Sequence, residues 1–134
     1  MESLWPKLEN VTRNLPIKIL QEQADLFNNQ MKGFLECSVE KDEYHGGSIL
    51  NSIKYDYEAI MYITSPILVG YRLSLLEVYF SIAKAYPCDI LDCVNDNFVP
   101  RTANNAEEFM NILKGIFNSK AVVEALENIV AQSQ

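Results

Sequence analysis

The segment from Ile53 to Ile63 constrains the fold more than any other part of the chain. Every odd-numbered residue in it is apolar, whereas the first three even positions are Lys54, Asp56 and Glu58. Successive side chains of a strand point to opposite faces, so a period of two predicts a half-buried β-strand. Such a strand belongs to an antiparallel sheet with one face packed on a core, which indicates an architecture but not a chemistry.

The residues before this strand predict a helix and a first strand. Pro16 suits the first turn of a helix, and Gly33 suits the left-handed position after its end. Between them runs a narrow apolar stripe: Ile17, Leu20, Ala24, Phe27 and Met31. From Leu35 to Val39 the period changes to two, so we expect a strand that pairs with the long one as a hairpin. Residues 1–15 show no regular pattern, and we interpret them as a loosely held arm.

The segment from Tyr71 to Tyr86 alternates in two phases. A strand with a bulge near Leu75–Leu76 would reconcile them, and a helix is the competing interpretation. Tyr86–Leu91 reads as a short edge strand opened by Pro87. After it, residues 95–97 are typical of a turn, and residues 100–104 are typical of a linking loop.

The C-terminal residues predict helices. Asn104 is a candidate N-cap, with Glu107 returning the bond three residues later. The expected buried positions, in two stretches that Asn118 and Ser119 separate, are Phe109, Ile112, Leu113, Ile116, Phe117, Val122, Val123, Leu126, Ile129 and Val130. Residues 16–134 are therefore expected to form one α+β domain: an N-terminal helix, an antiparallel sheet of about four strands, and C-terminal helices packed on one face.

Charge and composition narrow the functional classes. The formal net charge is -7 and the 11 Lys and Arg residues form no basic block, so we expect no nucleic-acid partner. The first residues lack the features of a signal peptide, and the most apolar stretch is too short for a membrane span, so we expect a cytoplasmic protein. Three cysteines are an odd and sparse set, unlike a disulfide framework.

For each group of residues that could bind a metal or act in catalysis, a purely structural role is the better interpretation. Asp56 and Glu58 would share a strand face without a third acid in phase, and a second acidic group, Asp89, Asp92 and Asp96, lacks the ligand spacing of a calcium loop. Cys88 and Cys93 have no second Cys/His pair to complete a zinc site. His45, the only histidine, lies beside two glycines in a predicted turn. We therefore expect no metal, no cofactor and no catalytic activity.

Ile60, Tyr62 and Tyr71 are the candidate binding residues. Ile60 and Tyr62 are apolar on the face of the long strand that is otherwise polar, so either the protein covers them or they form an interface, where tyrosine is enriched. We expect a non-enzymatic protein–protein interaction module with an acidic surface: an adaptor, a chaperone-like factor or an inhibitor. A homodimer through an edge strand or the C-terminal helices is consistent with this. The alternatives are a small-ligand sensor with a pocket between sheet and helices, and an enzyme using Asp and Tyr.

Several short segments together resemble a group of small uncharacterised bacterial proteins. They are Pro16–Ala24 with Gly33, Pro66–Leu68 leading to Tyr71–Arg72, Tyr86–Ile90, and Leu113–Ser119. The resemblance implies a bacterial α+β protein in which the segment from Tyr71 is a strand. It implies no activity and no functional residue.

Overall fold

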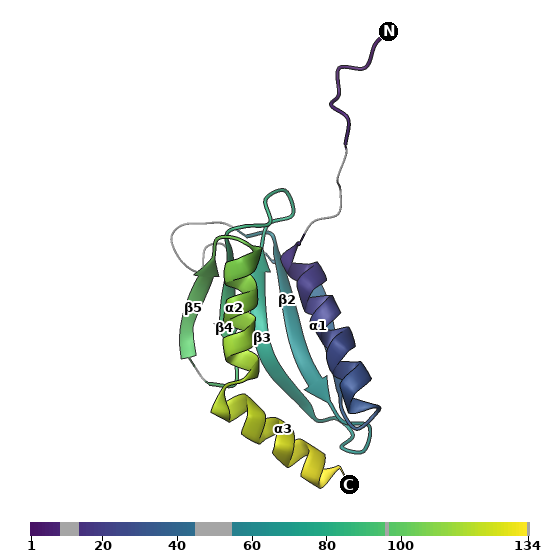
Figure 1. The fold of residues 1–134 in the computed structure, drawn as a ribbon, viewed down its shortest axis with the longest axis vertical. Helices are drawn as coiled ribbons and strands as arrows, with labels where there is room; N and C mark the ends of the chain where they lie inside the picture. Colours follow the sequence, from purple (N-terminus) through teal and green to yellow (C-terminus); the bar gives the residue numbers. More distant parts are fainter. Residues whose placement is uncertain (9–13, 45–54, 96, 134) are drawn as a thin grey trace.

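The computed structural model describes residues 1–8, 14–44, 55–95 and 97–133, and in these the chain forms an α+β domain. Its elements, in chain order, are α1 (Pro16–Met31), β1 (Glu36–Glu43), β2 (Tyr57–Thr64), β3 (Arg72–Phe80), β4 (Cys88–Asp92), β5 (Asn97–Ala103), α2 (Ala106–Phe117) and α3 (Lys120–Gln132). The strands pair antiparallel with their chain neighbours in the order β1-β2-β3-β4-β5 (Figure 1). The predicted fold class is confirmed, with five strands rather than about four.

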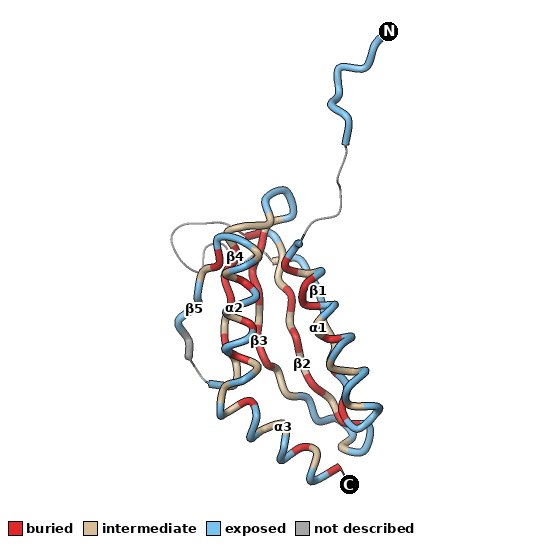
Figure 2. The backbone as a smooth tube through the Cα atoms, viewed as in Figure 1, coloured by how far each residue is buried: buried red, intermediate tan, exposed pale blue. Residues whose placement is uncertain are grey.

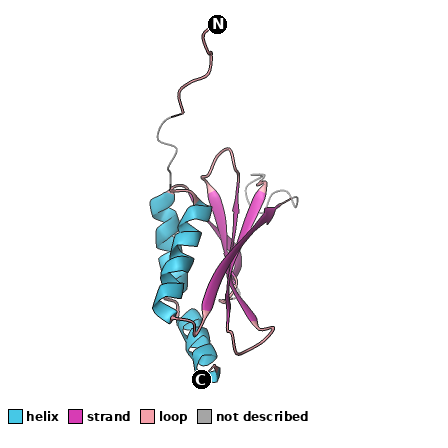
Figure 3. Cartoon of the chain, turned by 90° about the vertical axis from the view of Figure 1, so that its right-hand side faces the viewer, coloured by secondary structure: helices cyan, strands magenta, loops and turns pink. Residues whose placement is uncertain are grey.

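The described helices lie on one face of the sheet and leave the other face without a helix (Figure 3). Buried positions follow the strands and the helix faces turned toward them, as the red segments of Figure 2 show. The largest fully buried side chains include Phe109 of α2, Leu20 of α1 and Met61 of β2. The core is therefore a single layer between the sheet and the helices.

The alternation that predicted β2 is confirmed within the described residues. Ala59, Met61 and Ile63 are at most 1% exposed, and β1 pairs with β2 as the expected hairpin, with Val39 opposite Met61. The strand begins at Tyr57 rather than near Ile53. Ile53, Lys54 and the predicted turn at residues 45–48 lie outside the described residues.

The segment after Tyr71 is a strand with the expected bulge. Met61 pairs with Leu76 and Tyr62 with Ser74, so Leu75 is the extra residue of β3. Leu75 and Leu76 are both buried, because the bulge turns two consecutive apolar side chains away from solvent.

Two expectations about the following strands were wrong. β4 is not an edge strand, since it lies between β3 and β5. The predicted linking loop at residues 100–104 is largely β5, the true edge. Pro100 favoured a loop in the sequence because proline lacks an N–H group. An edge strand tolerates proline, since the backbone groups on its outer side form no hydrogen bonds with another strand.

The helix ends are close to their predicted positions. Lys32 and Gly33 both have positive φ, 49° and 89°, where the chain leaves α1 for β1. The cap of α2 is one residue later than predicted: the Asn105 side chain accepts from the Glu108 N–H at 2.9 Å. The Glu108 carboxylate accepts from the Asn104 N–H at 3.1 Å, one residue before the N-cap, which is a variant of the capping box. In the part of the chain that the structure describes, no helix is long and apolar enough to cross a membrane.

Candidate binding site: a groove between the helices

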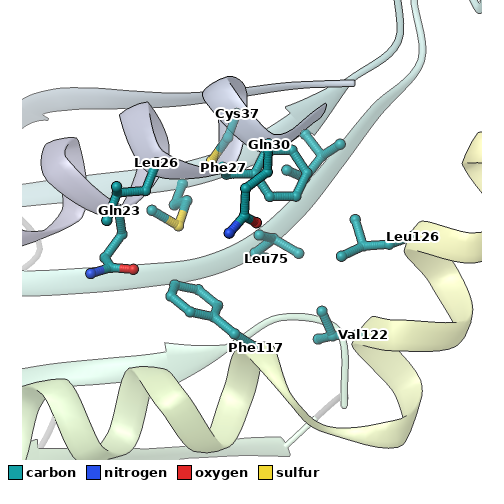
Figure 4. A pocket seen from close by; sticks show the side chains of 11 residues that line it. Gln23, Leu26, Phe27, Gln30, Cys37, Leu75, Phe117, Val122 and Leu126 are labelled. Carbon is teal, nitrogen blue, oxygen red and sulfur yellow. The ribbon is translucent and has the colours of Figure 1, made fainter. Parts of the chain in front are cut away.

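An apolar pocket of about 360 Å³ opens between α1 on one side and α2 and α3 on the other. Its floor is the sheet, through Cys37, Met61, Ile63 and Leu75 of the first three strands. Its walls are Gln23, Leu26, Phe27 and Gln30 of α1, Phe117 of α2, and Val122 and Leu126 of α3 (Figure 4). The helix layer is therefore incomplete over the middle of the sheet.

Two further pockets adjoin this one, one at each end. A space of about 300 Å³ toward the start of α1 shares Gln23 and Phe117 with it. Another of about 400 Å³ toward the end of α1 shares Phe27 and Leu126. We call the three together the interhelical groove. It borders α1 from Ile19 to Met31, a length of about 18 Å at 1.5 Å per helical residue.

The walls of the groove are fixed by buried and half-buried hydrogen bonds. Asn28 of α1 donates to the Cys37 carbonyl at 3.0 Å and accepts from the Cys37 N–H at 2.7 Å, which ties α1 to β1. At the far end of α3 the Ser133 hydroxyl donates to the Ile129 carbonyl, so the Ser65 hydroxyl donates to Ser133 at 2.7 Å. These bonds connect α1 to β1 and the end of α3 to the residue after β2, so these two walls of the groove are preformed in the fold.

The groove is electrically neutral along its central part. Two carboxamides, of Gln23 and Gln30, are its polar side chains beside the Cys37 thiol. Burial raises the pKa of Cys37 to about 12, so this thiol is uncharged at neutral pH. Leu26, 55% exposed, extends the apolar surface onto the rim. The site therefore suits an apolar group that carries one or two hydrogen-bonding atoms.

Ile60 and Tyr62 lie on the opposite, helix-free face of the sheet, and both are half-buried. The Tyr62 hydroxyl donates to Glu40 at 3.0 Å, and the Arg72 guanidinium lies over the Tyr62 ring. Side chains of the neighbouring strands thus cover this residue. The same face carries Glu58, whose pKa is raised by burial and by the carboxylates of Glu77 and Asp42.

Tyr71 is placed apart from Ile60 and Tyr62. It follows the β2–β3 loop and lines a shallow pocket of about 680 Å³ against α3. Together with Ile67 and Val69, which are 63% and 94% exposed, it forms an apolar patch at the end of the molecule near the C-terminus of α1. Phe34, 51% exposed, lies on the same side of this end, since it and Ile67 line one further pocket.

The acidic residues that suggested a cation site have structural partners instead. Asp92 accepts from the N–H groups of Val94 and Asn95, both at 3.1 Å, and stabilises the turn after β4. Asp56 accepts from the Ile82 N–H at 3.0 Å. Asp96 and His45 lie outside the described residues. Among the residues that are described, no three His, Cys, Asp or Glu side chains come together as a metal site.

Asp89 and Tyr55 form the one buried polar pair with unsatisfied atoms in the described region. Asp89 is 1% exposed and accepts from the Thr102 hydroxyl at 2.6 Å through Oδ1, whereas its Oδ2 has no hydrogen-bond partner of good geometry. The Tyr55 hydroxyl has no hydrogen bond of good geometry either, although it interacts with the Asp89 side chain; burial and then Asp89 raise the pKa of Tyr55. Both side chains are too deeply enclosed to meet a ligand in this arrangement.

Sequence reasoning offered a pocket between sheet and helices only as an alternative and assigned to it none of the residues that line the groove, although one signal was present. Leu26 lies beside the apolar stripe of α1, between Gln23 and Gln30 at helical spacing, and widens that stripe on one side. A helix whose apolar surface is wider than its packing requires has surface left for a second contact. The sheet floor could not be assigned from the sequence, since it is made by three different strands.

Comparison with known proteins adds no family to this description. A scan against protein-family models, a search of curated proteins and a search of solved structures each gave no match to the chain. The resemblance to small bacterial α+β proteins therefore stays a prediction.

Proposed function

We propose that this chain is a non-catalytic binding module that takes an amphipathic segment of a protein partner into the interhelical groove. The observation that carries the proposal is the row of three pockets beside α1 from Ile19 to Met31, of which the central one reaches the sheet. A row about 18 Å long matches three turns of a helix. Its three pockets match the way a helix places apolar side chains at i, i+4 and i+7.

The chemistry of the walls supports an apolar anchor rather than a charged one. The floor side chains Met61 and Ile63 are apolar, and the carboxamides of Gln23 and Gln30 can donate to or accept from a partner backbone. Charged residues line only the two ends, where Lys114 and Glu127 border the groove. Affinity is thus expected to come from buried apolar area, with specificity from the shape of the pockets.

Peptide display tests this proposal directly. A library of random 12- to 16-residue peptides, long enough for about three helical turns, is panned against the protein, and binders are measured against two matched variants. Leu26→Glu places a charge at the rim of the groove, and Gln21→Glu adds the same charge on the exposed side of α1. We expect binders with an apolar i, i+4, i+7 pattern that lose at least tenfold in affinity on Leu26→Glu and little on Gln21→Glu, an effect of about 1.4 kcal/mol or more. Binders indifferent to Leu26→Glu would show that the groove is not the site.

A small-ligand sensor is the second candidate, favoured by the central pocket alone. Its volume of about 360 Å³ falls within the range of small-molecule sites, and the Gln30 carboxamide lines it (Figure 4). Native mass spectrometry of the protein purified from its own host separates the two candidates. A bound metabolite that is absent from Leu26→Glu supports the sensor, and its absence from both proteins supports the peptide site.

The net charge of the chain and the edges of its sheet are evidence on two other possible partners, nucleic acid and a second copy of the chain. A net charge of -7 supports a protein partner over nucleic acid and suits the proposed cytoplasmic location. A homodimer through strand edges has less support than one through the helices. Asn28 occupies both backbone groups of Cys37 on the outer side of β1, and Pro100 removes a donor from β5.

A further inference from the structure

The N-terminal segment Met1–Leu8 carries large apolar side chains that pack on nothing. The exposed fractions of Leu4, Trp5 and Leu8 are 96%, 86% and 83%. Burial of any of these side chains would lower the free energy of the protein. Figure 1 shows this segment extending away from the start of α1. These three side chains lie within five residues and form an exposed apolar surface. Exposed apolar patches commonly mark a surface that binds another apolar surface.

The interhelical groove is the apolar site within reach of this segment. The chain enters α1 at Pro16, and the groove begins at Ile19, about one helical turn later. Asn14 is held near the same end, since its carbonyl accepts from the Tyr86 hydroxyl at 2.7 Å. From Asn14 to Leu8 the backbone spans at most about 20 Å, so Leu8 can reach the part of the groove that α1 borders from Ile19 to Phe27.

We propose that Met1–Leu8 folds back along the interhelical groove of its own chain and competes there with a partner. The inference rests on the proposed function, because it assigns the groove a second occupant. Pro6 favours an extended backbone at Trp5, so Leu4 and Leu8 would be about 13 Å apart, a distance that fits inside the groove. The apolar patch around Val69 is a poorer site, because it lies near the opposite end of α1, about 24 Å from Pro16.

Tethering makes even a weak contact effective. A short covalent connection gives a segment a local concentration that can reach the millimolar range at a site within its reach. The apparent affinity for a partner then falls in proportion to the fraction of chains whose groove is open. The segment would therefore set a threshold that a partner must exceed.

Trp5 reports on this contact directly, since it is the only tryptophan of the chain. Its fluorescence emission and its quenching by acrylamide are measured in the full chain, in Leu26→Glu and in the control Gln21→Glu. We expect blue-shifted emission and several-fold weaker quenching in the full chain and the control, and the values of an exposed tryptophan in Leu26→Glu. Leu8→Ser gives a second test. Leu8 is exposed and packs on no core residue, so this substitution should not affect folding. We expect Leu8→Ser, like Leu26→Glu, to give the fluorescence of an exposed Trp5.

Two results would overturn the proposal. One is the emission of an exposed tryptophan in all four proteins. The other is protection of Trp5 that grows with protein concentration, which would mean that the segment binds a second copy. Neither result depends on the peptide binders. If the groove binds peptides while Trp5 stays exposed, only this inference is overturned and the proposed function stands. Conversely, protection of Trp5 that Leu26→Glu abolishes can occur even where no partner peptide is found.

Discussion

The guanidinium carbon of Arg72 lies 3.5 Å from the centre of the Tyr62 ring. The same guanidinium is 3.3 Å from the Glu40 carboxylate, which also accepts from the Tyr62 hydroxyl. One residue from each of β1, β2 and β3 thus contributes to a small cluster on the helix-free face. This cluster explains why an apolar ring is tolerated on the otherwise polar side of β2, and it makes Tyr62 a weaker interface candidate than the groove.

A double-mutant cycle tests the strength of this contact. Arg72→Ala and Tyr62→Leu are made singly and together, and their free energies of unfolding are measured by urea denaturation. We expect a coupling energy of about 0.5–1 kcal/mol, as for cation–π pairs at exposed sites. Tyr62→Phe is the control: it keeps the ring and removes the hydroxyl, so most of the coupling to Arg72 should remain. A coupling near zero would mean that Arg72 lies over the ring without stabilising it.

Glu58→Gln should stabilise the protein at neutral pH. Glu58 faces Asp42 directly across the β1–β2 ladder, and like charges in such pairs are destabilising. Because solvent and salt screen an exposed pair, we expect a gain of about 0.5 kcal/mol or less in the free energy of unfolding. Glu36→Gln is the matched control, since Glu36 faces Thr64 and should gain nothing.

The gain from Glu58→Gln should depend on pH in a defined direction. The pKa of Glu58 is raised in the folded protein by burial, Glu77 and Asp42, so the folded state binds this proton more tightly than the unfolded chain. The penalty for ionised Glu58 is therefore complete above its raised pKa and is relieved as the pH falls toward the ordinary value of 4.5. Unfolding curves of both proteins from pH 7 down to pH 4 should converge; curves that diverge on acidification would show that the repulsion has been misassigned.

The sheet could be predicted where a strand has one wet face and one dry face. The alternation through Ala59, Met61 and Ile63 showed which side is buried, and the two phases around Leu75 showed the bulge. β5 could not be found in this way, because Pro100 carries a loop signal and only the pairing with β4 overrides it. The cap of α2 was ambiguous for a simpler reason: Asn104 and Asn105 have the same side chain, and the backbone decides between them.

The candidate site was less predictable than the fold because it is a space between elements. Leu26 and Leu126 come from the first and last helices, and the distance between those helices depends on how each one packs on the sheet. Ile60 and Tyr62 were accessible to pattern reasoning because one strand carries both. A pattern within one strand cannot show which neighbouring side chains will cover it, as Arg72 covers Tyr62.

The three thiols should react in the order of their exposure. Burial raises the pKa of Cys37 and of Cys88 to about 12, and both are at most 5% exposed. Cys93 is half-buried, and its pKa is raised to about 11, chiefly by burial. Iodoacetamide at mildly alkaline pH should therefore modify Cys93 slowly, and the other two only when the protein unfolds; peptide mapping by mass spectrometry identifies the modified residue, and Cys93→Ser should abolish the first phase. Reaction at Cys37 before Cys93 would contradict this order and would show that the groove opens down to its floor.

Asp89→Asn should make the protein more stable, although it alters a fully buried residue. The substitution keeps the oxygen that accepts from Thr102 and removes a negative charge whose second oxygen makes no hydrogen bond of good geometry. The new amide can donate to the Tyr55 hydroxyl, whose pKa is raised by burial and by Asp89. Satisfying one buried group is worth about 1 kcal/mol, which we expect as the gain in the free energy of unfolding at pH 7. Tyr55→Phe removes the other unsatisfied atom and should also stabilise the protein. The double mutant should gain less than the sum of the two single gains, because both substitutions relieve the same unfavourable pair. A loss of stability on Asp89→Asn would instead mean that the carboxylate accepts a bond through both oxygens in solution.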